Sequence, residues 1–327
     1  MSIPWISAEM TSLSAAYAAD RMPHALLIHE APGAGGDWLA NWTAQLVLCM
    51  HPDKAPCGVC TGCRRVLAGQ HPDLLALRPV EESKQIRIEQ VRELGQELAL
   101  TSHQGGYKVG LLSPADVLNR FAANALLKTL EEPSPRTLLM LVVTQPSRLP
   151  ATILSRCQRI RVRAPTRSEA TAWLQATRGD GDWDAVLDVL GEAPMSATES
   201  DAKAVVEIGR DTRRSLDEAG SAGTDPVATA EQWVRSDLAL RLRCFENWLT
   251  DRIRERAGAE PFLTEVRAGT HLPPSRTDLN IQQLFEVLDG VREMKSSLDA
   301  PLNRGLALES LLRRLSHQAE PRKQRNA

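Results

Sequence analysis

The chain has 327 residues, and its 39 Lys and Arg against 41 Asp and Glu give a formal charge of −2. A hydrophobic share of 43% with 24% charged residues is typical of a globular protein and excludes a disordered or fibrous one. The near balance of charge excludes a chain that coats itself in nucleic acid, because such binding needs clustered Lys and Arg. At roughly 150 residues per domain, the length predicts two or three domains.

The apolar runs are too short for a membrane span. The longest, at about residues 138–143, falls far below the roughly 20 residues that a spanning helix needs. Residues 1–20 lack the basic segment and apolar stretch of a signal peptide. We therefore expect a cytoplasmic protein without membrane contact.

Residues 1–164 alternate short apolar runs with helical patterns. This alternation is typical of the α/β class, in which a parallel sheet is joined by crossover helices. The predicted strands are 25–29, 73–77, 108–112, 138–143 and 158–162, and the predicted helices are 37–49, 88–100 and 119–131.

A glycine-rich turn follows the first predicted strand. Such a turn ahead of a helix can bind phosphate through its backbone N–H groups. Against the pattern G-x-x-x-x-G-K-[ST], Gly33 and Gly35 keep the turn, while Glu30 replaces the first glycine. Gly36 replaces the lysine, and Asp37 replaces the hydroxyl residue that binds Mg²⁺. Two carboxylates without a compensating cation repel a triphosphate, so we predict a degenerate loop that binds no ATP. The alternative is a generic turn between strand and helix.

Four of the six cysteines fall within fifteen positions, at Cys49, Cys57, Cys60 and Cys63. Four thiolates satisfy tetrahedral Zn²⁺ with no open position, which predicts a structural zinc module at 49–63. An iron–sulfur run would need a further cysteine soon after Cys63, and 64–69 contain none. His51 or His71 could replace one ligand. The isolated Cys244 is interpreted as a small buried hydrophobe.

The predicted strand 108–112 ends without the acids of a nucleotide hydrolase. Such an enzyme places an Asp there for Mg²⁺ and often a Glu that orients water. Here Ser113 and Pro114 follow the strand. Asp116 lies three positions too far along, and we interpret it as a helix cap or a surface carboxylate.

Helical periodicity dominates after residue 164. The predicted helices are 166–176, 183–190, 205–219, 228–257, 281–295 and 301–316, with a linker at 191–200, loops at 220–225 and 268–277, and a polar tail at 318–327. This pattern predicts three domains, at 1–164, 165–203 and 204–327.

Three segments resemble clamp-loader AAA+ proteins. They read PHALL at 23–27, NALLKTLEEP at 124–133 and PATILSRCQ at 150–158, and their order and separation also match. The resemblance covers about residues 4–164, and the helical remainder agrees in length only. It implies an AAA+-like sheet domain with a zinc knuckle, a small helical lid domain and a C-terminal helical collar domain. From its pattern alone, the middle segment reads as a packed helix, with Glu131 and Glu132 in a surface network.

The resemblance assigns a role to Arg156. In clamp loaders, the arginine of the motif Ser155-Arg156-Cys157 acts as an arginine finger for a neighbouring subunit. A guanidinium can stabilise charge that develops on a transferred γ-phosphoryl group. The alternative is an arginine that pairs with a nearby glutamate of its own chain.

The resemblance implies an ATPase-inactive subunit that helps to load a sliding clamp of bacterial DNA polymerase III onto primed DNA. Its partners would be the γ/τ and δ subunits, the clamp and primer–template DNA, and its only cofactor would be structural Zn²⁺. One alternative is an active clamp-loader ATPase of the γ/τ type. Another is a zinc-containing nucleic-acid-binding module, which the balanced charge and the few aromatic residues, 7 Trp, 2 Tyr and 4 Phe, support poorly.

Overall fold

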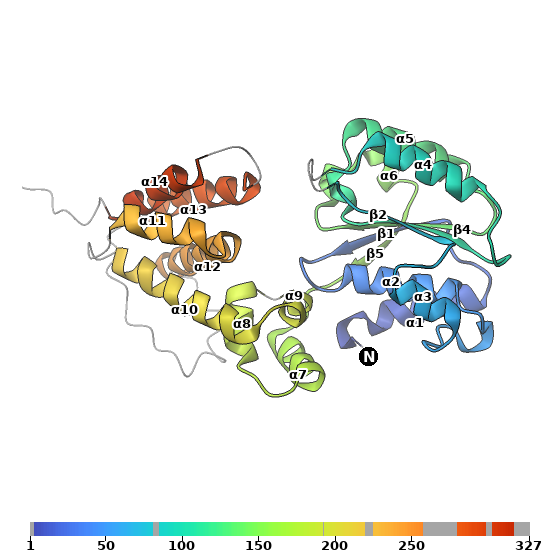
Figure 1. Cartoon of the computed structure of the whole chain (residues 1–327), viewed down its shortest axis with the longest axis horizontal. Coiled ribbons are helices and arrows are strands. Elements are labelled where there is room, and N and C mark those ends of the chain that lie inside the picture. Colours follow the sequence, from blue (N-terminus) through green and yellow to red (C-terminus); the bar gives the residue numbers. More distant parts are fainter. Residues whose placement is uncertain are drawn as a thin grey trace, which may run out of the picture. The chain divides into compact units, whose positions relative to one another are not determined.

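The computed structural model describes residues 3–80, 85–191, 193–219, 225–257, 280–298 and 303–316. Contacts divide the chain into two compact units, which we treat separately (Figure 1). The first contains the described residues of Met1–Gly179 and Glu192–Met195, and the second those of Asp180–Gly191 and Ser196–Ala327. The predicted division into three domains, with boundaries after 164 and 203, stays a prediction.

The first unit is built on a parallel five-stranded sheet with the strand order β2-β3-β4-β1-β5. Its strands are β1 (Ala25–Glu30), β2 (Leu74–Leu77), β3 (Lys108–Leu112), β4 (Thr137–Val143) and β5 (Gln158–Val162). All five predicted strands are confirmed. Every residue of β3 and β4 is buried, which explains why these strands read as continuous apolar runs.

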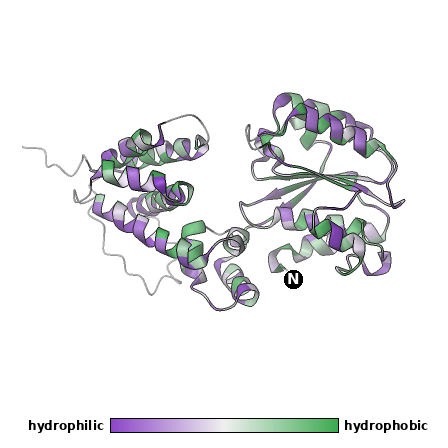
Figure 2. Ribbon diagram, viewed as in Figure 1, coloured by the Kyte–Doolittle hydropathy of each residue, from purple (hydrophilic) through white to green (hydrophobic). Residues whose placement is uncertain are grey.

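Helices cover both faces of this sheet (Figure 1). One face carries α1 (Ser7–Ala18), α2 (Gly36–Val47) and α3 (Thr61–Leu67), and the other carries α4 (Ile88–Ala99), α5 (Arg120–Glu131) and α6 (Ala151–Leu154). The helices α4 and α5 are amphipathic, and their ribbons carry both hydrophobic and hydrophilic residues (Figure 2). Short 3₁₀ turns lie at Pro4–Ile6, Pro52–Lys54, Ala115–Val117 and Pro146–Arg148. The last helix wholly in this unit, α7 (Arg167–Arg178), is joined to the N-terminal segment by Trp173, whose ring lies 5.5 Å from that of Trp5.

The second unit is helical. It comprises α8 (Trp183–Leu190), α10 (Ala202–Ala219), α11 (Pro226–Arg235), α12 (Leu238–Arg256), α13 (Ile281–Ser296) and α14 (Arg304–Ser316). Its core contains Trp233, Phe245 and Trp248 together with leucines of α13 and α14. Among the described residues, no helix is both long enough and apolar enough to span a membrane.

Two helix predictions are wrong. The predicted helix 228–257 is divided into α11 and α12, because Ser236 is extended and Asp237 adopts a left-handed φ of 52°. No Gly or Pro marks this break in the sequence. The predicted linker 191–200 contains the short helix α9 (Pro194–Glu199). The helices α1, α3 and α6 were not predicted. Most of the predicted loop 220–225, all of the loop 268–277 and the tail 318–327 lie outside the described residues.

Candidate functional site

The glycine-rich turn joins β1 to α2 and is filled by a side chain of the protein itself. Gly33 and Gly35 have φ values of 70° and 107°, a region that favours glycine. The carboxylate of Glu30, the last residue of β1, accepts hydrogen bonds from the nitrogens of Gly35 at 3.0 Å and Gly36 at 2.6 Å. These are N–H groups at the start of α2, where a bound phosphate would lie. Glu30 therefore occupies the position of the anion.

Burial raises the pKa of Glu30, and the N–H of Gly36 lowers it, while the nearby charge of Asp37 raises it further. The net direction is upward. A Cβ on Gly36 would lie 2.8 Å from the carboxyl carbon of Glu30, so a side chain at position 36 would require this carboxylate to move.

The N-terminal segment and Met195 pack against the same turn. The indole nitrogen of Trp5 donates to the carbonyl of Ala34 over 2.7 Å, and the side chains of Trp5 and the adjacent Ile6 are both buried. A Cβ on Gly35 would meet Ile6 at 3.0 Å and Met195 at 3.1 Å. The chain's own side chains therefore closely surround the turn.

Asp116 follows the carboxyl end of β3, and its side chain binds the residues that follow β4. It is buried and accepts hydrogen bonds from the nitrogen of Thr144 at 3.1 Å, the hydroxyl of Thr144 at 2.9 Å and the nitrogen of Gln145 at 2.9 Å. The interpretation as a helix cap or a surface carboxylate is wrong, because Asp116 fixes the chain after β4. Its Oδ2 accepts all three of these bonds.

Arg156 follows the short helix α6. Its Nη2 lies 2.7 Å from a carboxylate oxygen of Glu131, the last residue of α5, and its Nη1 donates to the carbonyl of Thr152 over 2.9 Å. The pairing with a glutamate of its own chain, which the sequence left open, is therefore present. The side chain of Arg156 is still 36% exposed, and that of Glu131 is 49% exposed.

The neighbours of Arg156 differ in burial. Cys157 is buried in the core between the sheet and the helices α4 and α5, and burial raises the pKa of its thiol to about 11, so the thiol is neutral at pH 7. Ser155 lies at the C-terminal end of α6, where its hydroxyl donates to the carbonyl of Thr152 over 3.1 Å. A buried cysteine thus anchors an arginine that faces solvent.

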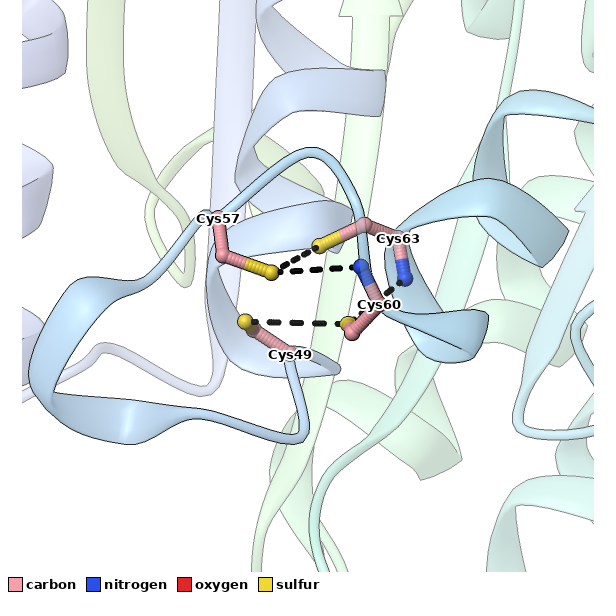
Figure 3. A group of neighbouring side chains, drawn as sticks. All are labelled: Cys49, Cys57, Cys60 and Cys63. Carbon is pink, nitrogen blue, oxygen red and sulfur yellow. Dashed lines mark hydrogen bonds between the residues drawn. The ribbon is translucent and has the colours of Figure 1, made fainter.

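The four clustered cysteines converge on one point (Figure 3). Their sulfur atoms all lie within 4.8 Å of one another, with 3.9 Å between Cys49 and Cys60 and 4.0 Å between Cys57 and Cys63. None forms a disulfide. Tetrahedral Zn²⁺ with bonds of about 2.3 Å requires sulfurs about 3.8 Å apart, so the spacing fits this ion.

Backbone geometry brings these sulfurs together. Cys60 caps the N-terminus of α3, where its sulfur accepts from the nitrogen of Cys63 over 3.3 Å. Gly62 is required, because a Cβ there would lie 2.5 Å from the carbonyl oxygen of Leu48. Burial opposes ionisation of Cys60, yet N–H groups that include those of Cys63 and Met50 lower the pKa of its thiol to about 6. Burial instead raises the pKa of the Cys49 and Cys63 thiols, so Cys60 is the cysteine of the cluster that ionises most readily to bind a metal cation.

Neither histidine joins the sulfurs. Among the described residues, the group of close ligand atoms contains the four cysteines and neither His51 nor His71. His71 is buried elsewhere, and its Nδ1 accepts from the nitrogen of Asp73 over 3.1 Å.

Sequence reasoning interpreted Glu30 only as a charge that repels phosphate. It missed the hydrogen bonds that the carboxylate accepts from Gly35 and Gly36, and it missed the packing of Trp5 and Ile6 against the turn. An acidic residue just before a glycine-rich turn is the signal that could have indicated the first. Nothing local indicates the packing of Trp5 and Ile6, because Trp5 and its partner Ala34 lie 29 positions apart in the chain.

Comparison with known proteins gives consistent matches. Residues 7–166 match the family described as "DNA polymerase III, delta subunit". The chain is 34% identical over 303 residues to "DNA polymerase III subunit delta'" of Pseudomonas aeruginosa, with 88% of this chain and 90% of that protein covered. It is 32% identical over 335 residues to the protein of the same name from Escherichia coli, with 97% and 96% covered. It is also 34% identical over 156 residues to "DNA polymerase III subunit tau" of Escherichia coli, with 47% and 24% covered.

Proposed function

This chain belongs to the DNA polymerase III subunit delta′ family, and we propose that it works in a clamp loader without hydrolysing ATP itself while it supplies Arg156 to a neighbouring ATPase subunit. Its partners are the γ/τ and δ subunits, the sliding clamp and primer–template DNA, all in the cytoplasm. The similarity to a tau subunit supports the assignment of these neighbours.

The observation that carries the proposal is the position of Glu30. Its carboxylate already accepts the hydrogen bonds from Gly35 and Gly36 that a phosphate would accept. A second anion at this point would meet the negative charge of Glu30, and the N–H groups of Gly35 and Gly36 already have an acceptor. Position 36 has no lysine, and the chain after β3 offers no free carboxylate, because Asp116 is committed to the chain after β4. The lack of a lysine at position 36 and the engagement of Asp116 both oppose the alternative of an active γ/τ-type enzyme.

Arg156 is suited to act on the nucleotide of another subunit. One planar guanidinium group can donate hydrogen bonds to two phosphate oxygens at once. In phosphoryl transfer it offsets the negative charge that develops on the γ-phosphoryl group. Buried residues on both sides, Ile153 and Cys157, fix the backbone that carries Arg156. Ser155 and Cys157 act as the context of this arginine and take no part in chemistry themselves.

Cys49, Cys57, Cys60 and Cys63 hold a structural Zn²⁺ in this proposal. Four protein ligands leave no position for water or substrate, so the ion would stabilise the fold between α2 and α3. The helices of the second unit form the collar domain, and the segment 165–203 forms the lid.

The proposal is tested by assembling a loader from this chain and its γ/τ and δ partners. We expect the chain to co-purify with them, and we expect the isolated chain to bind no radiolabelled ATP at millimolar concentration in equilibrium dialysis. An isolated γ/τ subunit is the positive control. Measurable ATP affinity of the isolated chain would instead favour the active ATPase.

A further inference from the structure

Arg156 is held by acceptors of its own chain at both terminal nitrogens. Nη1 donates to the Thr152 carbonyl, and Nη2 lies against the carboxylate of Glu131. A guanidinium is planar, so contacts to two of its nitrogens fix its orientation as well as its position. The first contact lies within the turn that carries Arg156, whereas the second comes from α5, which packs against α6.

We propose that Glu131 is a positioning residue for Arg156, which holds the guanidinium ready until the γ-phosphate of a neighbouring subunit replaces the carboxylate at Nη2. This inference rests on the proposed trans role of Arg156. Thr152 would keep Nη1 throughout, so the guanidinium would stay directed outward while it exchanges one anion for another.

The exposure of the pair makes this exchange feasible. Both side chains are more than a third exposed, and ion pairs between such groups shift equilibria by only a few-fold. A γ-phosphate carries more negative charge than one carboxylate, so it competes successfully for the guanidinium. A deeply buried partner would instead retain the arginine. Glu131 is thus strong enough to bias the orientation and weak enough to be displaced.

The adjacent Glu132 provides a matched control. It carries the same charge, it is exposed, and it follows Glu131 directly at the C-terminal end of α5. Substitution of either glutamate removes one negative charge from this end of the helix, but only the substitution of Glu131 removes the ion pair with Arg156.

The test measures ATP turnover by reconstituted loaders in the presence of clamp and primed DNA. The variants are Glu131→Ala, Glu131→Gln, Glu132→Ala, Arg156→Ala and the double variant Glu131→Ala/Arg156→Ala. We expect Glu131→Ala to lower kcat about two- to four-fold with little change in KM, since pre-orientation of a catalytic group acts on the chemical step. Glu131→Gln keeps an acceptor oxygen and retains more activity. Glu132→Ala matches the wild type.

The double variant separates positioning from a structural role. If Glu131 acts through Arg156, its loss changes nothing once Arg156 is absent, so the double variant equals Arg156→Ala. An additive loss, or normal or faster turnover of Glu131→Ala, overturns the inference. Normal turnover of Arg156→Ala overturns the proposed function and this inference together, whereas slow Arg156→Ala with normal Glu131→Ala overturns this inference alone. Thermal melting and complex formation verify that each variant folds. If Glu131→Ala does not fold, Glu131→Gln takes its place in the comparison.

Discussion

The carboxylate of Glu30 lies 2.6 Å from the backbone nitrogen of Gly36, so the end of β1 closes the turn that in a nucleotide-binding protein would hold phosphate. A residue of the chain itself supplies the negative charge that the start of α2 favours. The helix is thereby capped without any ligand.

Removal of this carboxylate should free the N–H groups of the turn. We expect Glu30→Gly to bind inorganic pyrophosphate at least about ten-fold more tightly than the wild type, because a helix N-terminus with free donors attracts anions. Isothermal titration calorimetry measures the affinity, and Glu132→Gly serves as the control for a lost surface charge. Equal affinities of wild type and Glu30→Gly would contradict the filled-turn account.

The raised pKa of Glu30 predicts a pH-dependent stability difference. Since the native state binds the proton more tightly than the unfolded state, the contribution of Glu30 to stability falls as pH rises from its ordinary pKa of 4.5 through its higher folded value. Glu30→Gln keeps an acceptor oxygen and does not titrate. Its free energy of unfolding, relative to the wild type, should therefore rise between pH 4 and pH 7. Urea unfolding at several pH values measures this difference, and a constant difference speaks against the shifted pKa.

Asp116 should matter for stability, because its carboxylate holds the chain after β4. Asp116→Ala leaves the buried N–H groups of Thr144 and Gln145 without their acceptor. Loss of such charge-assisted bonds costs about 3 kcal/mol in the free energy of unfolding. Urea unfolding compares it with Asp53→Ala, whose side chain is exposed and whose loss should cost less than about 0.5 kcal/mol. Similar effects of both substitutions would refute the role of Asp116 in fixing the chain after β4.

The cysteine cluster should carry about one zinc per chain. Cys63→Ser should lose the metal and lower the stability by roughly 3 kcal/mol, because three ligands no longer close the site. Cys244→Ala should keep the metal, since this buried cysteine lies in the second unit. Elemental analysis after growth in zinc-replete medium measures the content. A metal-free wild-type protein would rule out the zinc assignment.

Sequence patterns predicted those features that local chemistry determines. β4 was predictable because a strand buried on both faces must be apolar throughout, and the cysteine cluster because its spacing already brings four sulfurs near one another. The role of Asp116 could not be predicted, because its partners Thr144 and Gln145 lie 28 and 29 residues away, just after β4. The break at Asp237 was missed because an aspartate there adopts a conformation that usually requires glycine. Glu131 could be placed on a helix end, but only the fold brings it to Arg156.

We propose that Arg156 acts on the ATP of a neighbouring subunit, and the ATPase rate of the assembled loader tests this role. The measurement is ATP turnover, with clamp and primed DNA present, by a loader that contains Arg156→Ala, beside one that contains Arg92→Ala, an exposed arginine of α4. Because an arginine finger supplies much of the rate at its site, Arg156→Ala should slow turnover at least about five-fold with assembly unchanged, whereas Arg92→Ala should not. Full turnover by a correctly assembled Arg156→Ala loader would contradict the account.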